Sequence, residues 1–106
     1  MNTPDGLRWV DPWEPIPPGE GAPLEAELQR EVPVGHPLHG RTARAIGHRC
    51  DCDDVAFSLD DGTFAVVHLT WTGRTEPSPE WPSAALYADV GALQGQLDAD
   101  HQDYGL

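Results

Sequence analysis

The centre of the predicted fold is a pair of adjacent runs, Asp54-Val-Ala-Phe-Ser-Leu-Asp-Asp-Gly62 and Thr63-Phe-Ala-Val-Val-His-Leu-Thr-Trp71. Both runs are rich in β-branched and aromatic residues, which are favoured in strands. Between them lies Asp61-Gly62, a dipeptide that suits the left-handed backbone angles of a type I′ turn. The sequence therefore predicts a β-hairpin, with Asp61-Gly62 as a two-residue loop.

The length of that loop sets the strand register. A two-residue loop pairs Leu59 with Phe64 and Val55 with His68, and we expect these side chains on the core face. The other face is also largely apolar and needs a cover, for which a proline-rich N-terminal arm is the expected candidate. A three-residue loop would invert the faces of one strand, and the sequence leaves that alternative open.

Further strands are expected on both sides of the hairpin. Residues 41–49 combine small and β-branched residues with three arginines, which predicts a third strand at an edge of the sheet. We interpret these arginines as partners of the protein's own acids rather than as an anion site. Residues 84–87 predict a further short strand.

Two helices complete the expected fold. Leu24, Leu28 and Val32 recur every four residues, with charged residues between them, so a short helix is predicted to start at Pro23 and to end before Pro33. A second helix is predicted from Val90, Leu93 and Leu97, and its N-cap is expected at Asp89. The N-cap is expected because a carboxylate can accept a bond from a first-turn N–H.

The predicted fold class is α+β, an antiparallel meander of three or four strands. A short N-terminal helix and a C-terminal helix packed on one face accompany the sheet. Residues 1–22 are predicted to form a proline-rich arm packed on the domain, and residues 23–106 a single small α+β domain.

The charge balance narrows the range of partners. The 106 residues carry six arginines, no lysine and eighteen acidic residues, for a net charge of -12. This balance disfavours nucleic acid and anionic membranes, and the lack of lysine excludes Schiff-base and P-loop chemistry. No long apolar run or leader pattern is present, so we expect a cytoplasmic protein.

The function that we expect from these features is non-catalytic binding of a basic protein surface. An acidic field steers a protein toward basic partners, and exposed tryptophans are common interface anchors. The sequence leaves a monomer and a homodimer open. The residues expected at the interface are Asp53, Asp54, Asp60, Asp61, Trp71 and Trp81.

A metal site is one alternative function. On an extended strand, His48, Cys50 and Cys52 would point to the same side, so an imidazole and two thiolates could converge on a zinc ion. A fourth ligand would be needed, and structural zinc sites seldom use a single C-x-C pair. No cofactor is therefore the main expectation, with zinc as the alternative.

A small enzyme built around His68 is the other alternative. In the two-residue-loop register, Asp53 lies near His68 and could orient it, as in a nucleophilic triad. No G-x-S-x-G elbow is present, and Ser83 lies next to a proline. A structural histidine is therefore favoured over a catalytic one.

A resemblance to known proteins rests on three motifs: Asp53-Asp-Val-x-Phe-x-Leu-Asp-Asp-Gly62, Ala65-Val-Val-His-Leu-Thr-Trp71 and Glu80-Trp-Pro82. They resemble a small uncharacterised family of hypothetical bacterial proteins, over about residues 36–82. The resemblance implies a bacterial source and one compact domain, and no activity comes with it. In size, acidity and composition the chain is also similar in general type to bacterial immunity proteins.

Overall fold

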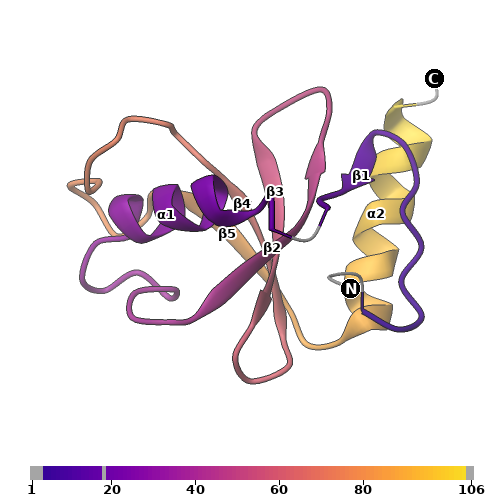
Figure 1. Ribbon diagram of the computed structural model, residues 1–106, viewed down its shortest axis with the longest axis horizontal. Coiled ribbons are helices and arrows are strands. Elements are labelled where there is room, and N and C mark those ends of the chain that lie inside the picture. Colours follow the sequence, from indigo (N-terminus) through magenta and orange to yellow (C-terminus); the bar gives the residue numbers. More distant parts are fainter. Residues whose placement is uncertain (1–3, 18, 105–106) are drawn as a thin grey trace.

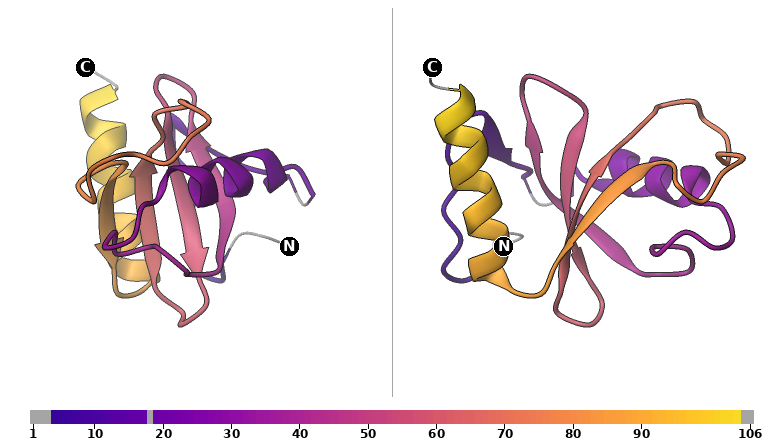
Figure 2. Two further views of the ribbon diagram at one scale, coloured as in Figure 1. Left: turned by 90° about the vertical axis from the view of Figure 1, so that its left-hand side faces the viewer. Right: turned by 180° about the vertical axis from the view of Figure 1, so that it is seen from behind.

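The computed structural model describes residues 4–17 and 19–104, which form a five-stranded antiparallel sheet with one helix against each face (Figures 1 and 2). The strands neighbour one another in chain order. The elements are β1 (Trp13–Pro15), α1 (Ala22–Glu31), β2 (Ala43–Arg49), β3 (Asp54–Leu59), β4 (Phe64–His68), β5 (Ser83–Tyr87) and α2 (Val90–Tyr104). The α+β class is confirmed. The sheet has five strands rather than the predicted three or four, because the arm adds an edge strand.

The hairpin of β3 and β4 has a three-residue loop. The N–H of Leu59 donates to the carbonyl oxygen of Thr63 at 2.8 Å, which leaves Asp60, Asp61 and Gly62 as the loop. Gly62 has a φ of 86°, a left-handed conformation that glycine adopts at little cost. The predicted two-residue loop is therefore wrong, since only one loop residue takes the left-handed conformation.

The register shift by one residue exchanges the faces of β4. Phe57 lies opposite Ala65, and Asp54 lies opposite His68. Val67 and Leu69 consequently join the face that α1 covers. Phe64, Val66 and His68 project from the α2 face, so His68 is not on the predicted core face.

The α1 side of the sheet holds the larger core cluster. Leu28 and Val32 are buried there, in agreement with the four-residue spacing, and α1 ends just before Val32 and Pro33. The buried side chains of this cluster are Ile16, Leu28, Val32, Leu38, Ala43, Ala45, Val55, Phe57, Leu59, Ala65, Val67 and Leu69.

The α2 side of the sheet is closed by the helix and by the arm together. Leu93 and Leu97 are fully buried against Trp13 and neighbouring side chains of the sheet. The Asp89 carboxylate accepts the N–H of Ala92 at 2.8 Å, so the predicted N-cap is confirmed. Within the described residues, neither helix is long and apolar enough to cross a membrane.

The arm lies against its own domain. Trp13 is buried and donates its indole N–H to Asp100 of α2 at 2.8 Å. Gln94 of α2 bonds both the N–H and the carbonyl oxygen of Arg8, at 2.7 and 3.0 Å. Residues 1–3 and 18 of the predicted arm lie outside the described residues.

Strand β2 is an interior strand, not the predicted edge. It pairs with β3 on one side and with β1 of the arm on the other, where Trp13 lies opposite Arg49. A bulge between Ala45 and Gly47 interrupts the β2–β3 register. The edge prediction fails because it did not allow for a strand from the proline-rich arm.

Candidate functional site

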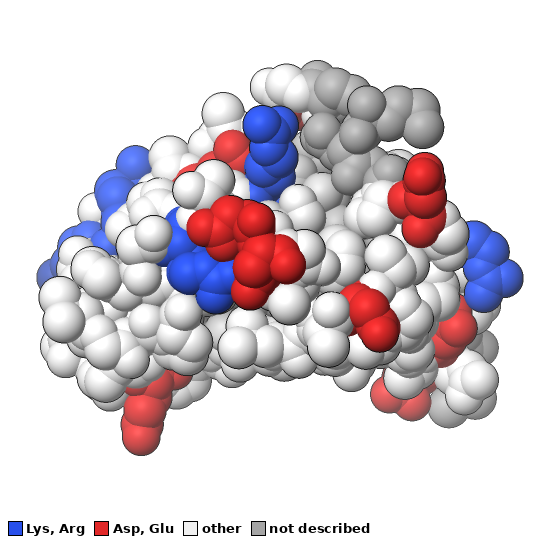
Figure 3. All heavy atoms as spheres, turned by 90° about the horizontal axis from the view of Figure 1, so that it is seen from below, with Lys and Arg blue, Asp and Glu red and all other residues white. Residues whose placement is uncertain are grey.

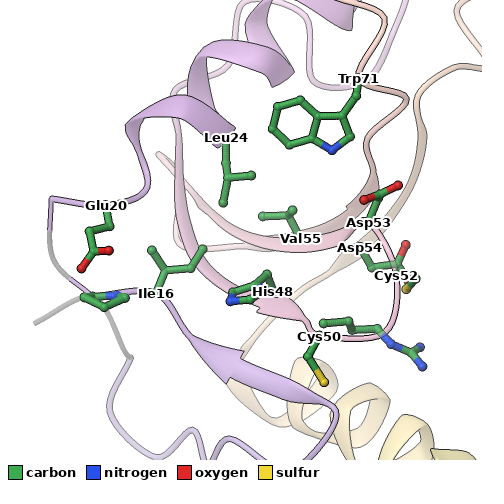
Figure 4. A pocket seen from close by; sticks show the side chains of 12 residues that line it. Ile16, Glu20, Leu24, His48, Cys50, Cys52, Asp53, Asp54, Val55 and Trp71 are labelled. Atoms are coloured by element: carbon green, nitrogen blue, oxygen red, sulfur yellow. The ribbon is translucent and has the colours of Figure 1, made fainter.

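One hollow of the described chain has a volume of about 540 Å³. We call it the acidic hollow. It lies between the start of α1, the loop after β2 and the segment that follows β4 (Figure 4). Its lining residues are Ile16, Pro17, Glu20, Leu24, His48, Arg49, Cys50, Cys52, Asp53, Asp54, Val55 and Trp71. It thus unites three predicted interface residues, Asp53, Asp54 and Trp71, with the three predicted metal ligands.

The acidic hollow has an apolar floor and charged sides. Val55 is buried at its base, and Leu24 of α1 lies beside it. The indole of Trp71 stands above them, 47% exposed. Figure 4 shows Glu20 and Asp53 on opposite sides of this floor. The arrangement offers apolar contact below and carboxylates at the rim.

Trp71 is held in an unusual backbone conformation. Its φ is 56°, in the left-handed region that bulky residues rarely adopt. Its N–H donates to the Oε2 of Glu31 at 2.8 Å, and the N–H of Thr70 donates to Oε1 at 2.9 Å. The N–H of Gly73 donates to Glu27 at 3.2 Å. Two carboxylates of α1 therefore position the segment that carries the exposed indole.

Glu27 and Glu31 are buried and electrostatically linked. Burial, and then the hydrogen bond with Glu27, raises the pKa of Glu31. The bond from Glu31 and the contacts with Arg30 lower the pKa of Glu27. Of the two carboxyl groups, Glu31 is therefore the one that keeps its proton to higher pH. The sequence pattern missed this role because charged residues between apolar ones in a helix usually face solvent.

The ion pairs of the described residues leave part of the hollow's negative charge uncompensated. Arg49 lies 2.8 Å from Asp51 and 3.6 Å from Asp100, and the bond to Asp51 is the main reason that its pKa is raised. No arginine pairs with Glu20 or Asp53 in the described part of the chain. The rim is therefore acidic at neutral pH.

The remaining predicted interface residues do not line the hollow. Asp60 and Asp61 occupy the turn at the opposite end of β3, and both lie 3.0 Å from Arg41. Trp81 is 48% exposed in the connection before β5. In Figure 3, acidic side chains are spread over the face shown, and arginine atoms lie against a central acidic group. The six predicted residues thus do not form one surface.

The predicted zinc ligands do not converge. His48 projects toward the acidic hollow, whereas Cys50 projects toward α2 (Figure 4). Both cysteines are free and exposed overall. Partial loss of solvent around the Cys52 sulfur is the main reason that the pKa of this thiol is raised. Across residues 4–17 and 19–104, no three His, Cys, Asp or Glu side chains are placed to hold a metal ion.

His68 has a different partner from the predicted one. Its Nδ1 lies 2.8 Å from the Oδ1 of Asp54, so the expected contact with Asp53 is wrong. The cause is the three-residue loop, which places His68 directly opposite Asp54. The side chain of His68 is 49% exposed, so this residue is not a core histidine.

Comparisons of the chain with protein-family models, curated proteins and solved structures find no match. The resemblance to an uncharacterised bacterial family therefore stays a prediction. Function has to be inferred from the geometry of the chain itself.

Proposed function

We propose that the chain is a protein-binding domain that receives a basic side chain of a partner protein in the acidic hollow. The observation that carries this proposal is the exposed indole of Trp71 above an apolar floor, between the carboxylates of Glu20 and Asp53. Arginine fits this arrangement better than lysine, because its planar group stacks on aromatic rings and bonds carboxylates bidentately.

Each part of the hollow supplies a different contribution. The face of an indole attracts a cation with about 0.5 to 2 kcal/mol, depending on how far the pair is desolvated. The carboxylate of Asp53 or Glu20 adds charge-assisted hydrogen bonds. Val55 and Leu24 can pack against the methylene stem of the incoming side chain.

The charge of the whole chain supports the same class of partner. A net charge of -12 raises the association rate with a basic surface, and salt screens this effect over a Debye length of about 8 Å at physiological ionic strength. We therefore expect the affinity for the basic partner to fall as salt is added.

The test uses the acetylated and amidated tripeptide Gly-Arg-Gly as probe, with the neutral isostere Gly-citrulline-Gly as matched control. Both are titrated into ¹⁵N-labelled protein at low and at physiological salt. We expect the arginine peptide to shift the Trp71 indole N–H and the Asp53 amide, and citrulline to shift neither. Raising the salt should weaken the effect.

Two variants separate the hollow from general acidity. Asp53→Asn removes one unit of charge at the hollow and should weaken binding severalfold. Asp60→Asn removes the same charge at the distant turn, where Arg41 already compensates it, and should leave binding nearly unchanged. Equal weakening by both variants, or shifts confined to residues outside the hollow, would disprove the proposal.

A further inference from the structure

Three side chains from neighbouring strands lie in line on the α2 face of the sheet. In the strand register, Asp54 of β3 lies opposite His68 of β4, and His68 lies opposite Ser83 of β5. Directly opposed residues of antiparallel strands project from the same face, with Cβ atoms about 4.5 to 5.5 Å apart. An acid, an imidazole and a hydroxyl are thus adjacent in that order.

The three side chains share one cavity. Its volume is about 240 Å³, and it is open to solvent between the sheet and α2. Its lining residues are Asp54, Val66, His68, Ser83, Ala84, Ala85, Tyr87, Gln96 and Asp100. This cavity is separate from the acidic hollow, and Asp54 is the residue that lines both.

Asp54 sets the orientation of the histidine. With the carboxylate ionised, the Nδ1–H of neutral His68 donates to Oδ1 at 2.8 Å, which leaves Nε2 as an acceptor. The His68 side chain is 49% exposed and that of Asp54 24%, so the pair is in reach of an incoming molecule. This is the orienting half of a nucleophilic triad.

Ser83 is placed to supply the other half. It is exposed on β5, which is an edge strand, and no hydrogen bond of its hydroxyl is found within residues 4–17 and 19–104. Its Oγ is therefore free to rotate about χ1 toward Nε2 of the opposed histidine. Catalytic hydrogen bonds are commonly long in a free enzyme and shorten when substrate binds.

We propose that Asp54, His68 and Ser83 form a nucleophilic triad that transfers short acyl groups from esters. Ser83 Oγ attacks the ester carbonyl carbon while its proton passes to Nε2 of His68. The bond to the leaving alcohol breaks, and the alcohol takes that proton. Water then attacks the acyl-serine and gives a proton to Nε2, which returns it to Oγ as the carboxylic acid departs. Asp54 stays ionised throughout.

The cavity indicates the class of substrate. Val66, Ala84 and Ala85 give it apolar walls, and its volume suits only a short acyl group. The carboxylates of Asp54 and Asp100 repel an anionic acyl chain. The substrate is therefore a short uncharged ester, whose leaving group faces solvent past the edge strand.

The test uses two probes, p-nitrophenyl acetate and a fluorophosphonate that labels activated serines. The labelled peptide is sequenced by mass spectrometry, because tryptic cleavage after Arg74 leaves Ser78 and Ser83 in one fragment. We expect the label on Ser83, and we expect Ser83→Ala to abolish it. Ser78→Ala is the matched control and should be labelled as the unchanged protein is.

Variants of the other two residues test the relay. His68→Gln and Asp54→Asn should each slow labelling and the initial release of p-nitrophenol at least tenfold. His68 and Ser83 are exposed, so their variants should keep the fold, which the amide spectrum checks. Labelling that is unaffected by His68→Gln would overturn the proposal. So would release that persists in Ser83→Ala and disappears in His68→Gln, because the imidazole would then act alone.

Labelling of Ser83, and its loss in the Ser83→Ala and His68→Gln variants, tests the triad independently of the protein-binding proposal. Ser83 and His68 do not line the acidic hollow, and neither Asp53 nor Trp71 lines the cavity of the triad. If the arginine peptide does not bind, Ser83 can still be labelled. If Ser83 is not labelled, the arginine peptide can still bind.

Discussion

Buried Glu31 accepts the main-chain N–H of Trp71 through its Oε2 at 2.8 Å, across forty positions of the chain. The bond holds a left-handed tryptophan at the rim of the acidic hollow. A carboxylate that points inward from α1 thereby determines the position of the exposed indole.

Glu31→Gln should lower the free energy of unfolding by about 1 to 3 kcal/mol, the usual cost of leaving a buried hydrogen-bonding group without its partner. An amide has only one acceptor oxygen, so either Thr70 or Trp71 then faces an NH₂ group. Urea unfolding measures the loss. Glu80→Gln, an exposed change of the same charge, should have almost no effect, and equal midpoints for the two variants would contradict the role of Glu31.

The pH dependence of stability should depend on the same residue. Because the folded pKa of Glu31 is raised above 4.5, its favourable contribution is complete below that value and is lost as pH rises through the raised pKa. The lowered pKa of Glu27 acts in the opposite sense, and its contribution is lost as pH falls. Glutamine at position 31 does not titrate. The stability gap between the unchanged protein and Glu31→Gln should therefore narrow as pH rises above 4.5, and a constant gap up to pH about 9 would refute this prediction.

Gly47→Ala should displace the indole of Trp9. A Cβ at Gly47 would overlap the ring carbons of Trp9, and overpacking of this kind typically costs about 1 to 3 kcal/mol. Gly95→Ala is the matched control, because nothing lies within 4 Å of its Cβ in α2. The control should gain about 0.5 to 1 kcal/mol from higher helix propensity. Thermal melting distinguishes the two changes, and a higher melting temperature for Gly47→Ala would show that Trp9 does not pack there.

Zinc should be absent in stoichiometric amount from protein purified without a metal-affinity tag. His48 and Cys50 project in different directions, which separates the ligands that a tetrahedral site requires. Elemental analysis and melting with and without chelator provide the measurement. A content near one zinc per chain, together with a melting temperature that chelator lowers, would instead support a zinc site at His48, Cys50 and Cys52.

Local signals of the sequence were sufficient to predict the hairpin and the two helices. Turn chemistry around Gly62 indicated the hairpin, a four-residue apolar spacing indicated α1, and Asp89 marked the start of α2. Each of these features depends on residues close together in the chain, where propensity and capping operate. The apolar character of both sheet faces also indicated that two covers were needed.

The way in which these elements combine depends on contacts between residues that are far apart in the chain. One extra loop residue reversed the faces of β4, and this placed His68 between Asp54 and Ser83 instead of beside Asp53. The arm became β1 because Trp13 could pair with β2 and bury itself against α2. The inward turn of Glu31 depended on main-chain donors forty residues away. A strand's side chains alternate with a period of two, so long-range pairing, not composition, determines which residues meet.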